Sequence, residues 1–177
     1  MISNLANKIF NESIDKYHEK NDVNQKIENP YPENSLEHLL YMKNWIDTVQ
    51  WHLEDIIRDP EISPEEALKI KRWIDKSNQE RTDVVEYLDS WFLNKYKDVK
   101  VKEGAKINTE SPAWALDRLS ILALKIYHMK EEVERNDITP EKKKEVIEKY
   151  NILLDNKKMC QQLLTNCLKR LKQEINI

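Results

Sequence analysis

Glycine is almost absent from this chain: Gly104 is the only one in 177 residues. Phosphate-binding loops, dinucleotide-binding fingerprints and tight hairpin turns each need several glycines. The sequence therefore excludes P-loop and Rossmann folds. Charged residues make up 34% of the chain and hydrophobic residues 40%, which is typical of long helices with one solvent-exposed face.

The chain also lacks an excess of positive charge and any long apolar run. Its formal net charge is -3, whereas a dedicated nucleic-acid-binding protein normally presents a basic face, so we expect no nucleic-acid partner. No apolar stretch reaches the length of a membrane span, and the first residues do not resemble a signal peptide. The two cysteines, Cys160 and Cys167, are about 10 Å apart on one predicted helix, too far for an intrachain disulfide. These features predict a reduced, soluble, cytoplasmic protein with no membrane partner.

Apolar residues recur three and four positions apart along most of the chain, which is the periodicity of amphipathic helices. The pattern predicts an all-α fold with five helices, at approximately residues 3–20, 35–57, 64–96, 112–135 and 140–175, and a loop at 99–110. A chain of this length suits one domain, which we take to span residues 1–177.

The second predicted helix carries one continuous apolar stripe, which we expect to face the core. The members of the stripe are Leu39, Met42, Ile46, Val49, Leu53 and Ile56. The flank beside it holds tyrosine, tryptophan and histidine side chains, and we expect that flank to be half-buried.

Two parts of the chain resemble each other. Residues 51–66 align with residues 127–142 without a gap, at an offset of 76 that places His52 on His128 and Pro64 on Pro140. Serine or threonine before proline is a common helix start, so any two helical hairpins in phase would align to some extent. We favour a duplication, which predicts an antiparallel four-helix bundle made of two similar hairpins, with the N-terminal helix packed outside.

Arg81 interrupts the apolar stripe of the third predicted helix, between Ile74 and Val84. A charged group on a buried face costs several kcal/mol unless it is paired and hydrogen-bonded. Arg81 therefore needs an acidic partner, a ligand or a path to solvent. Its plausible acidic partners are Asp47 on the second helix and Asp117 or Glu110 near the start of the fourth.

Polar side chains near Arg81 form the predicted ligand site. The candidate residues are Asn44, Asp47, Asn78, Arg81, Thr82, Asp117 and Arg118. Guanidinium and amide donors without an obvious nucleophile suit a small anionic molecule such as a phosphate or carboxylate ester. A buried arginine–aspartate pair that fixes helix register explains the same residues, and the sequence leaves both interpretations open.

Metal binding has less support in the sequence. The histidines fall on three predicted helices, and three of them could together hold a metal ion with an open coordination position. However, no HxxxH or ExxH pair presents two ligands on one helix face. We therefore expect no cofactor, and His52 and His128 remain the candidates if a metal binds.

Acidic residues on the third helix allow an enzyme hypothesis. Glu86 and Asp89 form an ExxD motif that follows Glu65 and Glu66, as in helical nucleotide pyrophosphohydrolases that gather carboxylates around magnesium. Lys69 stands where that pattern has its third glutamate. The motif is therefore incomplete.

Three long segments resemble a known family. NPYPENSLEHLLYMKNWIDTVQWHLEDIIRDP, NQERTDVVEYLD and NTESPAWALDRLSILALKIYHMKEE are similar to a bacterial family of helical proteins known only as a domain of unknown function and frequent in Bacteroidetes-like organisms. The resemblance implies a bacterial, cytosolic, all-helical protein. It implies no activity and no catalytic residues.

Three hypotheses of function follow. The first is a cytosolic helical bundle that binds a small anionic molecule or a protein partner through the polar cluster around Arg81. The second is a metal-dependent hydrolase that acts on a nucleotide or a phosphorylated sugar. The third is a homodimer built on the long last helix.

Overall fold

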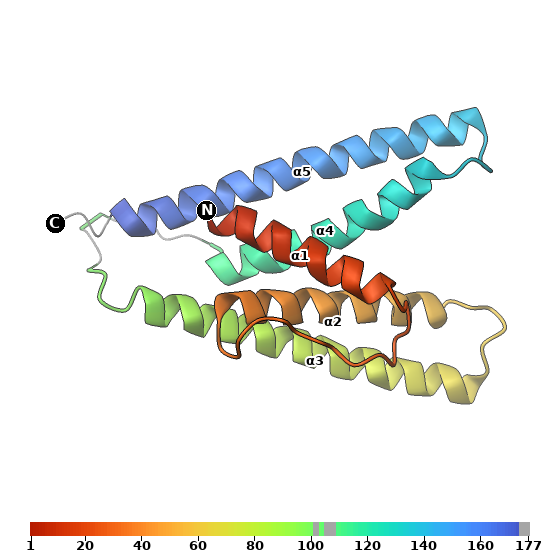
Figure 1. Ribbon diagram of the computed structural model, residues 1–177, viewed down its shortest axis with the longest axis horizontal. Helices are drawn as coiled ribbons and strands as arrows, with labels where there is room; N and C mark the ends of the chain where they lie inside the picture. Colours follow the sequence, from red (N-terminus) through yellow and green to blue (C-terminus); the bar gives the residue numbers. More distant parts are fainter. Residues whose placement is uncertain (101–102, 105–108, 174–177) are drawn as a thin grey trace.

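The computed structural model is helical throughout its regular structure (Figure 1). It describes residues 1–100, 103–104 and 109–173, and its helices are α1 (Ile2–His18), α2 (Leu36–Ile56), α3 (Pro64–Lys95), α4 (Pro112–Glu134) and α5 (Pro140–Gln173). The predicted all-α fold is confirmed. Parts of the predicted 99–110 loop and of the predicted end of the last helix lie outside the described residues.

Serine caps fix the starts of three helices. The side chains of Ser35, Ser63 and Ser111 each accept a hydrogen bond from a backbone N–H in the first turn of α2, α3 and α4. Pro64 and Pro112 occupy the first helical position, where a missing N–H costs nothing. These local signals explain why the predicted helix boundaries agree with the observed ones to within a few residues.

The helices form two hairpins, α2 with α3 and α4 with α5, and α1 lies between them (Figure 1). α1 contacts α2, α4 and α5, and its Ala6, Ile9 and Phe10 are fully buried. The expectation that the first helix packs outside the bundle is therefore wrong, because its broad apolar face is needed to join the two hairpins. Among the described residues, the backbone of α5 lies close to those of α4 and α1 and not to those of α2 or α3.

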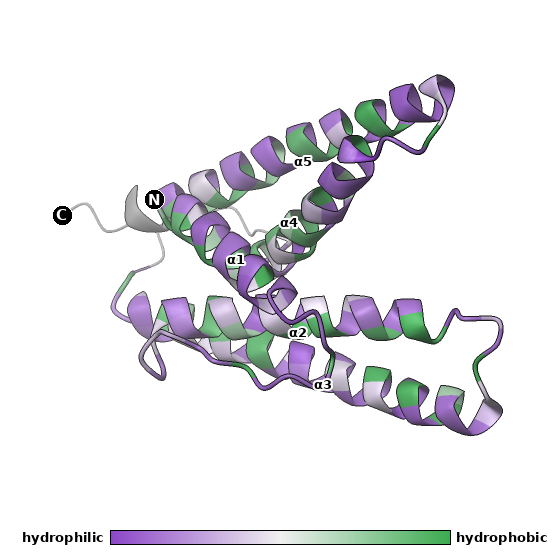
Figure 2. Cartoon of the chain, turned by 45° about the vertical axis from the view of Figure 1, so that its right-hand side comes forward, coloured by the Kyte–Doolittle hydropathy of each residue, from purple (hydrophilic) through white to green (hydrophobic). Residues whose placement is uncertain are grey.

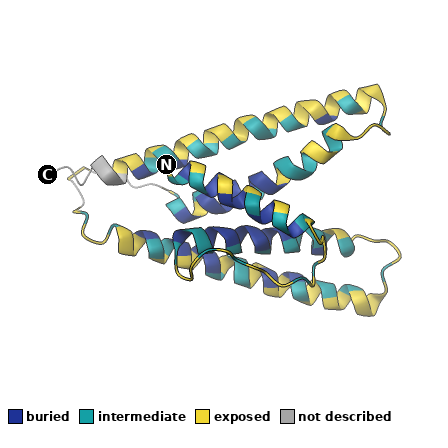
Figure 3. Cartoon of the chain, in the orientation of Figure 1, coloured by how far each residue is buried: buried dark blue, intermediate teal, exposed yellow. Residues whose placement is uncertain are grey.

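The core is concentrated in the middle of the molecule. Buried residues gather on α1, α2 and α4, whereas most of α5 and the first turns of α3 are exposed (Figure 3). Hydrophilic and hydrophobic residues alternate along α3 and α5, as in amphipathic helices (Figure 2). In the part of the chain that the structure describes, no helix has both the length and the apolar character that crossing a bilayer requires.

The buried side of α2 includes polar as well as apolar residues. Lys43, Asn44 and Thr48 have no exposed surface, like Leu40 and Leu53, whereas Met42 and Ile46 of the predicted core stripe are only half-buried. The sequence pattern identified the apolar stripe but not which face α4 covers. α4 packs on the polar side of α2, and this places charged groups inside the molecule.

Candidate functional site

Arg81 lies against two buried carboxylates. Its Nε and Nη2 donate to Asp117 Oδ1 at 3.1 and 3.0 Å, and Nη2 also donates to Asp117 Oδ2 at 3.0 Å. Its Nε lies 3.4 Å from Asp47 Oδ1. The Arg81 side chain is 28% exposed, while both aspartates are almost completely buried. The structure thus brings Arg81 together with two of the residues expected around it, Asp47 and Asp117.

A second cation, Lys43, completes this arrangement, and the sequence analysis did not identify it. Its ammonium is fully buried, contacts Asp47 Oδ2 and lies 3.0 Å from Asp117 Oδ1. Lys43 and Asp47 are four residues apart on α2, a spacing that favours ion pairs and could have revealed the lysine. The four-charge cluster of Lys43, Asp47, Arg81 and Asp117 has two positive and two negative groups, so its charges cancel.

Neutral side chains extend the four-charge cluster toward α4. Ser120 Oγ donates to Asp47 Oδ2 at 2.6 Å, and Asn44 Nδ2 donates to Ser120 Oγ at 3.1 Å. Burial raises the pKa of Asp47 above its ordinary value, while Lys43 and Ser120 act in the opposite direction by binding the ionised carboxylate. This network ties α2 to α4.

The other residues of the predicted ligand site face outward. Asn78 accepts a hydrogen bond from Gln50 at 2.9 Å, and Thr82 Oγ1 donates to the Asn78 carbonyl at 3.0 Å. Arg118 pairs with Glu110 at 2.8 Å, with two thirds of the arginine side chain exposed. Asn78, Thr82 and Arg118 therefore have partners outside the four-charge cluster and do not converge with Arg81 on one ligand.

Three histidines meet at another place. His18 near the end of α1, His52 near the end of α2 and His128 in α4 each offer a ring nitrogen, and these nitrogens all lie within 4.8 Å of one another. The two Nε2 atoms of His18 and His52 are 3.3 Å apart. We call these three residues the histidine cluster.

Hydrogen bonds on the outer nitrogens orient two of the imidazoles. His18 Nδ1 lies 2.7 Å from the carbonyl oxygen of Ile14, and His128 Nδ1 lies 2.9 Å from Glu131 Oε2. In a neutral imidazole the nitrogen that faces an acceptor carries the proton, which leaves the Nε2 atom of each of these two rings with the lone pair. His128 Nε2 is buried and has no hydrogen-bond partner among the described residues.

Aromatic rings hold all three imidazoles in place. Each histidine stacks on one ring, with centroid distances of 5.0 Å for His52 on Tyr17, 4.4 Å for His18 on Tyr127 and 4.9 Å for His128 on Trp51. The interplanar angles of the three stacks are 12, 29 and 7 degrees. Rings fixed in this way lose little freedom when they bind a ligand.

Two of the three imidazoles, those of His52 and His18, are held in their neutral form. Burial lowers the pKa of His52 to about 4, with a further contribution from His18 and His128. Burial also lowers the pKa of His18. Neutral imidazole is the protonation state that coordinates metal ions.

The donor set fits a transition-metal ion. Zn²⁺ binds imidazole nitrogens at about 2.0–2.1 Å, which in tetrahedral geometry places two nitrogens about 3.3 Å apart. The Nε2 atoms of His18 and His52 have this separation. His128, whose Nε2 is buried without a hydrogen-bond partner among the described residues, could supply the third nitrogen. Three protein ligands leave a fourth position for water or substrate.

A hollow of about 510 Å³ opens beside the histidine cluster, between α2, α4 and α5. Its lining includes His128, the carboxylates of Asp55, Glu131 and Glu132, and one cation, Lys125. His128 is thus shared between the histidine cluster and this hollow.

The position of His52 and His128 matches the predicted repeat. Their rings lie 5.5 Å apart, and they are the residues that the offset of 76 treats as equivalent. Asn44 and Ser120, which share a hydrogen bond, are also 76 residues apart. Residues at equivalent positions of two repeats would meet in this way near a pseudo-two-fold axis that relates the repeats. This spacing is a sequence signal that could have pointed to His52 and His128, whereas it gives no indication of His18.

A family model for a protein of unknown function, DUF4254, matches residues 37–177. The chain belongs to the DUF4254 family. The resemblance to a helical family of unknown function is thereby confirmed. The DUF4254 match covers α2 to α5 with His52 and His128, while α1 with His18 precedes it. Among curated proteins and solved structures, none matches this chain.

Proposed function

We propose that this protein binds one divalent transition-metal ion, best fitted by Zn²⁺, through His18, His52 and His128, and uses the open coordination position for a hydrolytic reaction. The convergence of three imidazole nitrogens from three helices carries the proposal. It departs from the sequence-based expectation of no cofactor. It develops the hypothesis of a metal-dependent hydrolase, with histidines in place of carboxylates as ligands.

The residues around the site have distinct roles in this proposal. Zinc, when bound, would lower the pKa of a coordinated water to about 7 and so supply a nucleophile at neutral pH. Glu131 holds the Nδ1 proton of His128 and makes that imidazole a more basic ligand, as the Ile14 carbonyl does for His18. Asp55 and Glu132 line the hollow and can accept a proton there. Lys125 can contact an anionic group of a substrate.

The four-charge cluster supports ligand binding less well. Arg81 already donates to both oxygens of Asp117, and the charges of the cluster cancel. An anion that bound Arg81 would have to displace a buried carboxylate, which is costly. The pairing supports a structural role for Arg81.

The test is a metal titration of chelator-treated protein. We expect one Zn²⁺ per chain, and Co²⁺ in its place should give the absorption of a tetrahedral ion. Replacing His18, His52 or His128 singly with alanine should weaken zinc binding at least about a hundredfold, because each replacement removes one of the three ligands. His38→Gln is the control, since His38 Nδ1 faces the Tyr31 carbonyl outside the histidine cluster. Absence of stoichiometric zinc, or equal loss in the control, would refute the metal site.

Hydrolysis is tested separately. The zinc-loaded protein should turn over at least one member of a panel of phosphate esters, carboxylate esters and amides, and His128→Ala should abolish that turnover. If the protein binds stoichiometric zinc but turns over none of these substrates, it is a metal-binding protein and the proposed hydrolase activity is wrong.

Homodimerisation is a second proposal, supported by the outer face of α5. Ile152, Met159 and Leu163 are 59–65% exposed and lie along one side of that helix. Light scattering should give twice the mass of the chain, and Met159→Glu should halve it. A monomeric wild-type protein would rule out this role.

A further inference from the structure

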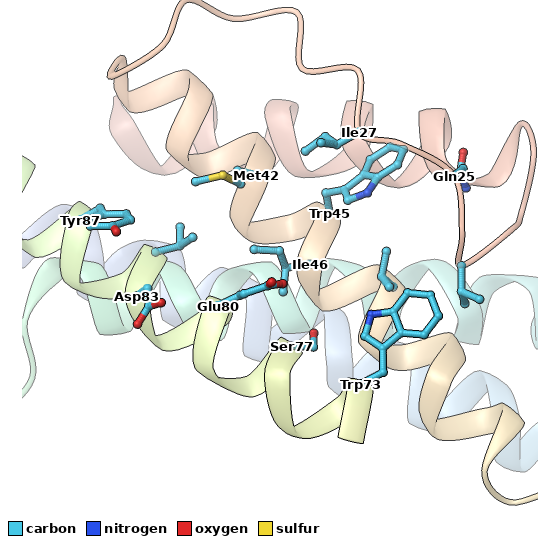
Figure 4. A pocket seen from close by; sticks show the side chains of 13 residues that line it. Gln25, Ile27, Met42, Trp45, Ile46, Trp73, Ser77, Glu80, Asp83 and Tyr87 are labelled. Carbon is cyan, nitrogen blue, oxygen red and sulfur yellow. The ribbon is translucent and has the colours of Figure 1, made fainter. Parts of the chain in front are cut away.

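A second pocket lies away from the histidine cluster, between α2, α3 and the chain segment that follows α1. Its volume of about 420 Å³ is in the range of small-molecule sites. Figure 4 shows the indole rings of Trp45 and Trp73 near one end and the ring of Tyr87 at the other. The half-buried Met42 and Ile46 of α2 form much of the wall between them.

The charges that line this pocket all have one sign. Glu80 and Asp83 contribute carboxylates from adjacent turns of α3, and none of the described residues that line the pocket is positively charged. In Figure 4 the Glu80 side chain extends toward Ile46, along the wall of the pocket. Its partner outside the pocket is Lys76, 3.3 Å away, in an ion pair whose two side chains are 75% and 46% exposed. Such a pair is worth little and can be replaced by a ligand.

The pocket is largely formed before any ligand binds. Trp45 is 6% exposed and its ring packs edge-on against Tyr17. Gln25, on the covering segment, donates from Nε2 to the Tyr17 carbonyl at 2.9 Å. This anchor holds the segment over the groove, so a ligand would not have to order it.

We propose that this pocket binds a small organic cation, an ammonium group attached to an apolar body. Glu80 and Asp83 would face the ammonium group, and the tryptophan rings would contact both the apolar body and the cation through their faces. Neutral or anionic molecules of the same shape lack the attraction to the carboxylates. The pocket shares no lining residue with the histidine cluster, so the proposal is independent of the metal site.

The test compares three probes of nearly equal size in calorimetry: 2-phenylethylamine, 2-phenylethanol and phenylacetate. We expect the amine to bind about tenfold more tightly than the alcohol, and phenylacetate to bind most weakly. The measurements are made with a chelator present, because an amine could otherwise coordinate a metal ion at the histidine cluster. Equal affinity for the three probes, or no saturable binding of the amine, would overturn the proposal.

Variants of the lining residues test whether the amine binds in this pocket. The double change Glu80→Gln and Asp83→Asn should abolish the preference for the amine, while Trp73→Leu should weaken all three probes. Trp73 is chosen over Trp45 because Trp45 packs on Tyr17, which itself stacks on His52. Glu86→Gln, at an exposed position of α3 outside the pocket, is the matched control and should bind like the wild type. A preference that survives the double change would place the amine elsewhere.

Discussion

The four-charge cluster and the histidine cluster lie in the same bundle, and α2 and α4 contribute residues to both. In the first, each cation faces a carboxylate and the charges cancel. In the second, ring nitrogens of three histidines lie within 4.8 Å of one another, and His128 Nε2 is buried without a hydrogen-bond partner among the described residues. Unmet bonding capacity, more than burial, therefore distinguishes the proposed metal site from the charge-balanced cluster.

The two clusters also differ in what removing one member does. A buried charge that loses its partner keeps its desolvation cost, so removing one member of the four-charge cluster should lower the free energy of unfolding. An imidazole of the histidine cluster that is replaced leaves no buried charge behind. Such a replacement should therefore weaken metal binding and leave the stability of the metal-free fold largely unchanged.

The largest expected effect is that of Lys43→Met on stability. The variant leaves Asp47 and Asp117 with Arg81 as their remaining cation. Breaking a buried ion pair costs about 3–5 kcal/mol, to be measured as the free energy of unfolding in urea. Lys71→Met is the control, because the Lys71–Asp75 pair is more than half exposed and should cost less than about 1 kcal/mol. Equal stability of the two variants would contradict the structural role of the four-charge cluster.

The second-largest expected effect is the stabilisation of the fold by added zinc, which should depend on the histidine cluster and not on the four-charge cluster. At a hundredfold excess over the Kd, zinc should stabilise the wild type by about 2.7 kcal/mol and raise its Tm. His52→Ala should lose this response. Arg81→Ala should lower the starting Tm, because it leaves Asp47 and Asp117 with Lys43 as their remaining cation, yet keep the zinc response. If Arg81→Ala also lost the response, the two clusters would not be separate.

Glu131→Gln should have a moderate effect that is confined to metal binding. Glu131 accepts the Nδ1 proton of His128, and loss of such a partner typically weakens metal affinity about 10–100-fold. The matched control is Glu134→Gln, one turn along the exposed side of α4, where the glutamate pairs with Lys130. Calorimetry with zinc measures both variants. Equal affinities would show that Glu131 does not support the metal ligand.

The parts of this molecule that depend on local sequence were predictable. The serine caps and the apolar periodicity fixed the helix limits, and the polar Arg81 within a buried stripe correctly indicated a partner among Asp47 and Asp117. Local patterns could not show which side of α2 is covered by α4. For this reason Lys43 was missed, although it is fully buried.

The histidine cluster illustrates the same limit. His52 and His128 were candidates because histidines fall on three helices, but each helix supplies a single ligand, and no helical motif marks such a site. His18 joins them because α1 packs between the hairpins, against the expectation that it packs outside. The duplication itself and the cytoplasmic location stay predictions.

The smallest expected effect is the response of the metal-free protein to acid, and it again sets the two clusters apart. The pKa of His52 is lowered to about 4, mainly by burial and then by His18 and His128, while Asp55 and Glu131 oppose the shift. The unfolded chain, with an ordinary histidine pKa near 6.5, therefore takes up the proton first. Stability from this group is complete above pH 6.5 and is lost as the pH falls toward 4.

The raised pKa of Asp47 has the opposite sign, because the folded state takes up that proton more readily than the unfolded chain. Urea denaturation of the wild type and of His52→Gln at pH 7 and pH 5, with a chelator present, distinguishes the two contributions. We expect the wild type to lose more stability over this interval than His52→Gln does, because the variant has no imidazole at that position to protonate on unfolding. Parallel losses in the two proteins would show that His52 is not held neutral by the fold, and would remove one argument for a preformed metal site.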